Sequence, residues 1–164
     1  MRLLHFYRNN YGFTLIETLI VLIILGILVA FTAPSFLSMN NKAKMNDAVN
    51  KVRGALQEAQ REAMRKSKNC TLTLNTLNNK ITSNDGCLVT GDRTLPKGVN
   101  MAYNGSNIIN YGMRGNTTTN KTIRLSLSDG SGQTKCIAVS LPLGIIRTGI
   151  YDTNATPPVC KKQL

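Results

Sequence analysis

The chain has 164 residues, enough for one domain with an additional segment but too few for two domains of ordinary size. Hydrophobic residues make up 42% and charged residues 17%, which argues against both a disordered chain and a highly charged fibre. The formal net charge of +12 indicates a polyanionic neighbour, either nucleic acid or an anionic membrane surface. Of the possible classes of protein, a soluble cytosolic enzyme is the least favoured.

The first element in chain order is an apolar segment at residues 13–33, in which Glu17 is the one charged residue. A helix needs about 20 residues to cross the hydrocarbon core of a bilayer, so this segment is long enough. Arg2 and Arg8 precede it without any acid, and the positive-inside rule therefore predicts a cytoplasmic N-terminus. We predict a single membrane-spanning helix at residues 13–36, with the rest of the chain outside the cytoplasm.

Three interpretations of this segment compete. A secretory signal cleaved near Ala33 is disfavoured, because the apolar run is longer than usual and Pro34 lies inside the cleavage site. A plain membrane anchor leaves Glu17 unexplained, since an unpartnered carboxylate in a spanning helix costs roughly 2.5–3.5 kcal/mol. In the third interpretation, another subunit supplies the partner of Glu17.

The third interpretation rests on residues 12–17, which read Gly-Phe-Thr-Leu-Ile-Glu and directly precede the apolar run. This segment closely resembles the processing motif of type IV pilins and of the pseudopilins of type II secretion. The resemblance implies that a prepilin peptidase removes residues 1–12 by cutting after Gly12 and that Phe13 becomes N-methylated. It also implies that Glu17 pairs with the N-terminal amine of a neighbouring subunit, an attraction that is strong in a dry helix bundle.

A second helical pattern follows at residues 37–69, after a kink expected at Pro34. One apolar stripe recurs at spacings of four and three residues: Met45, Val49, Val52, Leu56, Ala59 and Ala63. Asn69 is the predicted end of the helix. The resemblance implies one continuous, slightly bent helix, and a stripe of mostly Ala and Val suits packing on a sheet better than a coiled coil.

The polar side of this helix carries acid-first pairs at i,i+4, Asp47 with Lys51 and Glu62 with Lys66. Residues 42–68 contain eight cations and three acids. Such a cluster is more typical of a solvated helix near a membrane than of a DNA-binding surface.

From residue 70 to residue 164 the pattern changes to short alternating runs with Gly and Asn turns. Residues 71–74 and 80–82 flank an Asn-rich turn, and further strands are predicted at 122–128, 136–139 and 145–151. Together with the resemblance, this predicts an α+β, pilin-like fold in which a long N-terminal α-helix packs on a C-terminal antiparallel β domain.

Residues 122–151 form a predicted meander that contains the glycine-bounded segment 144–149. This part of the chain resembles the C-terminal end of the H-type pseudopilins and of the FimT group of minor pilins. In some members of that group, a Gly-Arg-x-Arg element is associated with DNA binding. Gly144 and Arg147 match it here, but Ile145 occupies the position of the first arginine. The missing arginine removes a phosphate contact, and Arg147 has a second interpretation as a cation that protects an edge strand from pairing.

The four cysteines, Cys70, Cys87, Cys136 and Cys160, all lie in the part predicted to be outside the cytoplasm. In an oxidising compartment they predict two disulfides with three possible connectivities, of which local pairing is the simplest. Closing loops of this length contributes about 3 kcal/mol in the chain-entropy model. A zinc site is disfavoured because the chain has no Cys-x-x-Cys pair.

No enzyme is expected. The one histidine, His5, lies in the predicted leader, and there is no P-loop, nucleophile elbow or dinucleotide fingerprint. The acids of the predicted β domain lie in turn-forming contexts, so we predict no catalytic, metal or cofactor site.

Two functions from different classes follow. The first is a minor pilin or pseudopilin subunit that is processed, held in the inner membrane and assembled with other subunits into a type IV pilus or a type II secretion pseudopilus. The second is a pilus-borne DNA receptor for natural transformation that binds the phosphate backbone without sequence preference. The candidate DNA-binding residues are Lys121, Arg124, Lys135, Arg147, Lys161 and Lys162.

Overall fold

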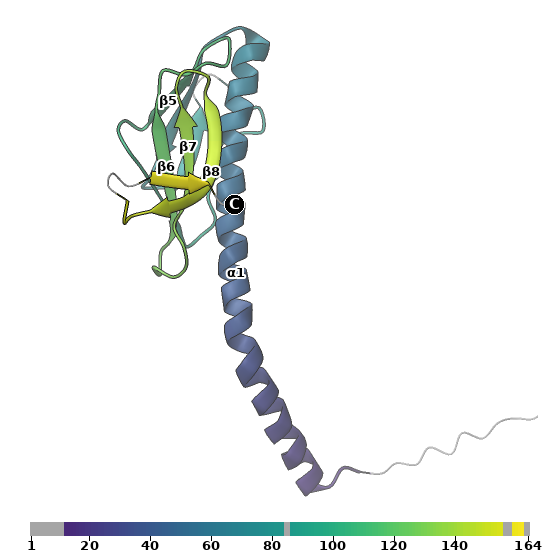
Figure 1. The fold of residues 1–164 in the computed structure, drawn as a ribbon. Helices are drawn as coiled ribbons and strands as arrows, with labels where there is room; N and C mark the ends of the chain where they lie inside the picture. Colours follow the sequence, from purple (N-terminus) through teal and green to yellow (C-terminus); the bar gives the residue numbers. More distant parts are fainter. Residues whose placement is uncertain (1–11, 84–85, 156–158, 163–164) are drawn as a thin grey trace, which may run out of the picture. The chain divides into compact units, whose positions relative to one another are not determined.

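The computed structural model describes residues 12–83, 86–155 and 159–162, without the side chains of residues 30–35 and 162. The chain forms two compact units, Met1–Met39 and Asn40–Leu164. One helix, α1 (Leu15–Lys66), runs through both units without interruption (Figure 1). The backbone is therefore helical at Pro34. The side chain of Pro34 lies outside the described residues, so the kink expected there stays a prediction.

In the first unit, α1 begins directly after Thr14, whose hydroxyl accepts a hydrogen bond from the Glu17 amide at 3.3 Å. The apolar side chains of its first turns are exposed, with Leu15 at 82% and Leu22 at 69%. Among the described residues, no helix combines the length and apolar character that a membrane crossing requires. The membrane span predicted at 13–36 is therefore not confirmed.

In the second unit, α1 packs through the predicted stripe. Its fully or nearly fully buried side chains are Met45, Ala48, Val52, Ala55, Leu56, Ala59 and Ala63, and Val49 is partly buried against them. These residues share one hydrophobic core with both β sheets, so packing on a sheet is confirmed over a coiled-coil seam.

The helix ends earlier than predicted. Ser67 adopts a left-handed conformation with φ of 49°, and its amide bonds to the Met64 carbonyl at 3.3 Å. The Lys68 amide bonds to the Ala63 carbonyl at 3.2 Å, which closes the last turn. The prediction of Asn69 as the end was therefore wrong by three residues, because Ser67 carries no sequence signal for a left-handed cap.

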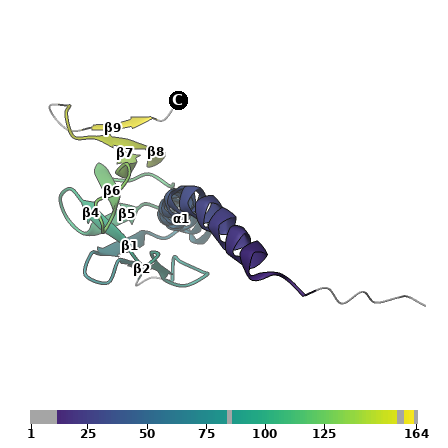
Figure 2. The same cartoon turned by 90° about the horizontal axis from the view of Figure 1, so that it is seen from below.

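Two antiparallel sheets complete the second unit (Figure 2). The first has the order β3-β2-β1-β5, and the second has the order β4-β6-β7-β8-β9. The strands are β1 (Cys70–Asn75), β2 (Lys80–Ser83), β3 (Arg93–Thr94), β4 (Val99–Tyr103), β5 (Ile108–Tyr111), β6 (Lys121–Leu127), β7 (Lys135–Ser140), β8 (Ile145–Asp152) and β9 (Val159–Lys162). The expected hairpin β1–β2 and the expected strands β6, β7 and β8 are present, whereas β3, β4, β5 and β9 were not predicted.

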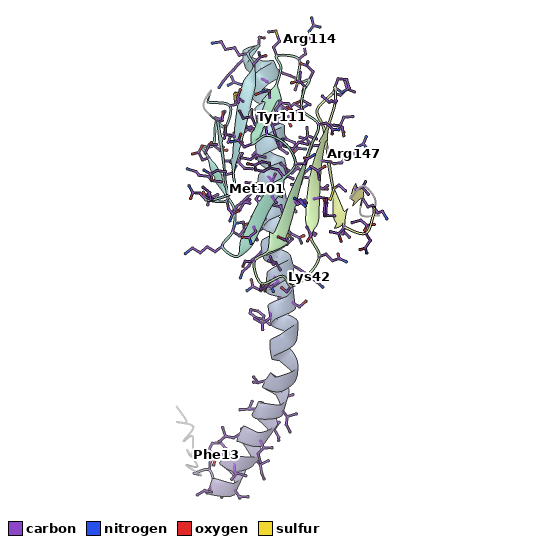
Figure 3. The ribbon with its side chains drawn as sticks, turned by 90° about the vertical axis from the view of Figure 1, so that its left-hand side faces the viewer. Phe13, Lys42, Met101, Tyr111, Arg114 and Arg147 are labelled. Atoms are coloured by element: carbon purple, nitrogen blue, oxygen red, sulfur yellow. A yellow bond between two sulfur atoms is a disulfide. The ribbon has the colours of Figure 1, made fainter. Side chains whose placement is uncertain are left out.

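Among the described residues, Tyr111 is the aromatic side chain that is fully buried in the core between the sheets and α1, and the partly buried Tyr103 packs against this core. Figure 3 shows Tyr111 and Met101 within this core. The Tyr111 hydroxyl has no hydrogen-bond partner among the described residues, and burial raises the pKa of this phenol well above its ordinary value.

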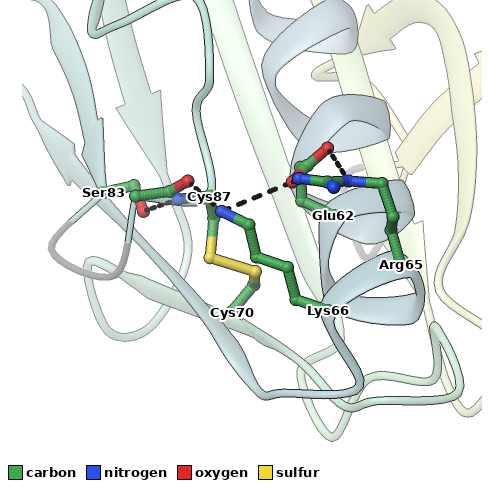
Figure 4. Close-up of a disulfide and its surroundings, with 7 residues drawn as sticks. Glu62, Arg65, Lys66, Cys70, Ser83 and Cys87 are labelled. Carbon is green, nitrogen blue, oxygen red and sulfur yellow. Dashed lines mark hydrogen bonds and ion pairs between the residues drawn. A yellow bond between two sulfur atoms is a disulfide. The ribbon is translucent and has the colours of Figure 1, made fainter.

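Two disulfides join Cys70 to Cys87 and Cys136 to Cys160, which is the local pairing. Figure 4 shows the first bond beside the C-terminal end of α1, where Lys66 donates a hydrogen bond to the Gly86 carbonyl at 2.8 Å. The second bond joins β7 to β9 across the intervening strand β8.

Candidate functional sites on the first helix and the second sheet

The predicted processing segment is exposed at the start of α1. Phe13 is 78% exposed, and Glu17 lies in the first turn, where a negative charge suits the helix dipole. Within the described part of the chain, the Glu17 carboxylate has no hydrogen-bond or ion-pair partner. Such a carboxylate is available to a cation from outside the chain.

Sequence reasoning missed the role of Thr14. Its hydroxyl caps the helix by accepting from the Glu17 amide, and its carbonyl accepts from the Thr18 amide at 3.2 Å. A threonine followed three residues later by a glutamate, directly before an apolar run, is the sequence signature of such a cap. Thr14 therefore fixes the helix start two residues after Gly12 and orients the turn that carries Glu17.

The candidate DNA-binding residues do not form one surface. Alternation along β6, β7 and β8 places Arg124, Arg147 and Tyr151 on the face that points away from the core, because Ile123, Leu125 and Ile137 fill the opposite face. The outward positions of these three strands carry no carboxylate among the described residues.

On this outer face, Arg124 lies over the ring of Tyr151 with 5.1 Å between the guanidinium carbon and the ring centroid. Arg147 is exposed opposite Ala138, and no hydrogen bond or ion pair holds it within the described chain (Figure 3). The aromatic contact orients one guanidinium while the other stays in water. Together they can contact two phosphates of an extended anion.

Lys121 was wrongly taken as a surface cation. It is 1% exposed, its ammonium donates to the Ser106 carbonyl, and it lies over the Tyr103 ring at 5.1 Å. Burial lowers the pKa of this ammonium. Lys121 therefore cannot reach a phosphate. The sequence did not predict this, because a lysine is ordinarily expected at the surface.

Two further candidates lie away from the outer face. Lys135 bonds to Asn46 Oδ1 of α1 at 2.8 Å, and Lys161 forms an ion pair with Asp152 at 2.7 Å. The hydrogen bond from Lys161 lowers the pKa of the Asp152 carboxyl. Lys162 is in register with Gly149 on β8, while its side chain lies outside the described residues.

Gly144 has a structural role that differs from the expected one. Its φ is 65°, and a Cβ there would lie 3.0 Å from Gln60 Nε2, 3.0 Å from the Gly115 carbonyl and 3.1 Å from Tyr111 Cε1. The glycine is thus required by packing, whether or not Arg147 binds anything.

The described residues contain no group of three or more His, Cys, Asp or Glu side chains able to hold a metal ion. The four cysteines are all used in disulfides, so the zinc alternative has no ligands from them.

An N-terminal helix that packs on antiparallel sheets and starts within a Gly-Phe-x-x-x-Glu segment defines a pilin-like protein. Residues 7–33 match the model of the prokaryotic N-terminal methylation motif, and residues 48–142 match the model of the type II transport protein GspH. The second match spans more than half of the chain. The chain therefore belongs to the GspH family.

Solved structures show the same fold. The minor pilin FimU of Pseudomonas aeruginosa PAO1 matches with a TM-score of 0.55 and 12% identity, over 66% of this chain and 90% of that chain. The minor pseudopilin EpsH from the type 2 secretion system of Vibrio cholerae matches with a TM-score of 0.51 and 12% identity, over 63% of this chain and 97% of that chain.

A type IV major pilin, PilA of Myxococcus xanthus DK1622, is 41% identical over 61 residues. The aligned part is 37% of this chain and 27% of that pilin, so the chain spans about a quarter of the length of this relative. The resemblance to pilins and pseudopilins is thereby confirmed, but these matches do not single out the FimT group.

Proposed function

We propose that the protein is a minor subunit of a type IV pilus or of a type II secretion pseudopilus. A prepilin peptidase removes residues 1–12, Phe13 is methylated, and residues 13–36 hold the subunit in the inner membrane before assembly. Residues 37–69 and the disulfide-bonded domain at 70–164 then face the periplasm or the exterior. The membership of the GspH family supports this role over that of an enzyme.

One observation carries the proposal: α1 presents an acid and a row of apolar side chains that its own unit leaves exposed. Ile16 is 61% exposed and Leu28 is 57% exposed, and the Glu17 carboxylate has no partner within the described chain. An apolar surface of this extent marks a site of association with lipid or with other helices. In the assembled filament, Glu17 pairs with the amine of Phe13 of a neighbouring subunit.

The test uses the full-length chain expressed in its own host. Glu17→Gln removes the charge but keeps the shape, and Asp47→Asn is the matched control on the exposed side of the same helix. The amount of each variant is measured in the membrane fraction and in sheared filaments. We expect Glu17→Gln to enter the membrane normally and to fall at least about tenfold in filaments, as loss of a buried ion pair predicts.

Normal incorporation of Glu17→Gln would contradict the charge pairing. Mass spectrometry of the wild-type N-terminus provides an independent measurement, with a methylated Phe13 as the expected first residue.

A second candidate function is DNA binding by the outer face of β6–β8. The observation that favours it is the acid-free surface shared by Arg124 and Arg147, with Tyr151 orienting the first. Duplex DNA is titrated into the full chain in detergent at several salt concentrations. We expect each of Arg124→Ala and Arg147→Ala to reduce the salt slope by about 0.9.

Lys135→Ala is the matched control, because Lys135 lies on the other face and is bound to Asn46. DNA binding that is equally weakened by all three variants would mean that total charge is responsible and that the outer face is no site.

A further inference from the structure

Four exposed apolar side chains surround the place where two loops meet the last turns of α1. Met64 comes from the helix, Met113 from the loop after β5, and Leu141 and Leu143 from the turn between β7 and β8. Their exposed fractions are 46%, 54%, 50% and 66%. We call these four residues the loop patch.

Hydrogen bonds to backbone carbonyls hold the two loops of the loop patch in place. Gln60 Nε2 on α1 donates to the Gly115 carbonyl at 2.8 Å and to the Leu143 carbonyl at 3.2 Å. The Thr117 amide donates to the Pro142 carbonyl at 2.8 Å, which joins the two loops to each other.

Helix and loop approach each other closely at Gly115, where a φ of 76° favours a glycine. A Cβ on Gly115 would lie 2.9 Å from Met64 Sδ, so the methionine side chain rests directly on the loop backbone. Because hydrogen bonds already order the two loops, docking of a partner there costs little conformational entropy of the loops.

The charge around the loop patch is positive. Arg114 lies in the loop beside Met113, at the end of the second unit in Figure 3, and Arg61 lies one helical turn before Met64. Both are exposed, and neither has an ion-pair or hydrogen-bond partner among the described residues.

Acids are absent from the loops that form the loop patch, since the sequence has none between Asp92 and Asp129 or between Asp129 and Asp152. On α1, Glu62 is bound by Arg65 at 2.7 Å, and Glu58 is bound by Arg93 at 2.6 Å. The neighbouring carboxylates of the helix are therefore already neutralised by partners of their own.

We propose that the loop patch docks an acidic protein, namely the surface of a different pilin-like subunit in which apolar side chains are ringed by Asp and Glu. This rests on the proposed function as a filament subunit. A second copy is disfavoured because it brings the same excess of positive charge, which is +12 for the full sequence. A membrane is disfavoured because the loop patch has no aromatic anchor. DNA is disfavoured because the four residues of the patch are apolar and only the two neighbouring arginines are charged.

The experiment uses the full chain in detergent micelles, with the other Gly-Phe-x-x-x-Glu proteins of the host as purified binding probes. Dissociation constants are measured by thermophoresis at low and high salt. We expect subunits of net negative charge to bind, more weakly at high salt. Leu143→Ser and Arg114→Glu should each weaken binding about tenfold or more, as expected for central interface groups.

The matched controls are Leu77→Ser, an exposed leucine (92%) in the β1–β2 turn, and Lys42→Glu, an exposed cation on α1. Both should stay within about twofold of the wild type, because neither belongs to the loop patch or to the arginines beside it. The urea midpoint of every variant is measured to show that it is folded.

Binding only to its own copy or to a subunit of net positive charge would overturn the proposal, and so would binding to none of the probes. Loss of binding in the controls to the same extent as in the patch variants would overturn it too. Duplex DNA or anionic vesicles that bind through Leu143 and Arg114 would assign the patch to another ligand. If the wild type enters filaments in a Glu17-dependent manner, the proposed function stands even when the patch variants bind normally.

Discussion

Gly144→Ala tests the packing between the turn after β7, the buried ring of Tyr111 and α1. An alanine at φ of 65° costs about 1 kcal/mol in backbone conformation. Its Cβ would lie 3.0 Å from the Gly115 carbonyl and 3.1 Å from Tyr111 Cε1, and neither group can swing away because one is backbone and the other is fully buried. Overpacking of this kind costs about 1–3 kcal/mol.

The added methyl group would also lie 3.0 Å from Gln60 Nε2, which donates to both loop carbonyls. Displacing Gln60 loses about 1 kcal/mol of hydrogen bonding. We therefore expect Gly144→Ala to lower the free energy of unfolding by about 3–5 kcal/mol and the melting temperature by roughly 10 °C.

The matched control is Gly130→Ala, where φ is 70° and a Cβ meets nothing within 4 Å. This variant should lose only the conformational cost of about 1 kcal/mol. Urea unfolding of the full chain in detergent is followed by tyrosine fluorescence, since the chain has no tryptophan. Equal losses in the two variants would refute the packing argument, because sterics alone distinguish the two sites.

Three further predictions concern stability. Replacing both Cys70 and Cys87 by serine should lower the free energy of unfolding by about 3 kcal/mol, because the bond closes a loop with a sequence separation of 17; an unchanged urea midpoint would count against this. The lowered pKa of Lys121 means that the unfolded chain binds its proton more tightly, so stability should rise with pH as the pH approaches the ordinary lysine pKa of about 10.4, and Lys121→Met should remove that rise. The lowered pKa of Asp152 predicts that its contribution is present above about pH 4 and is lost as the pH falls further; Asp152→Asn should make the acid-side decrease in stability shallower, and an identical acid profile would contradict the role of Lys161.

The sequence predicted the elements that carry a hydrophobic pattern over many residues or a specific short motif. Residues 12–17 carry a specific motif, the stripe from Met45 to Ala63 repeats over five turns of helix, and β6 alternates over seven residues. Strand β4, by contrast, has only two buried apolar positions, Val99 and Met101, and an alternation this short does not distinguish a strand from a loop. Strands β3 and β9 form because longer neighbours offer hydrogen-bonding partners, which no local pattern records.

By itself, the sequence determined the capped helix start, the apolar face of α1, the spacing of the cysteines and the excess of positive charge. Those properties depend on residues near one another in the chain. The tertiary structure decided which cations share a surface. Pairing of β6, β7 and β8 placed Arg124 and Arg147 on one face, turned Lys135 toward α1 and buried Lys121 beneath Tyr103.

It also decided that Gly144 serves packing and that Met64, Met113, Leu141 and Leu143 gather at one place. Each of these outcomes depends on contacts between segments that are far apart in the sequence, such as Gln60 with Gly115 and Leu143. Alternation along a strand tells which side chains lie on the same side. Only the pairing of strands and their packing on α1 tell which side faces water.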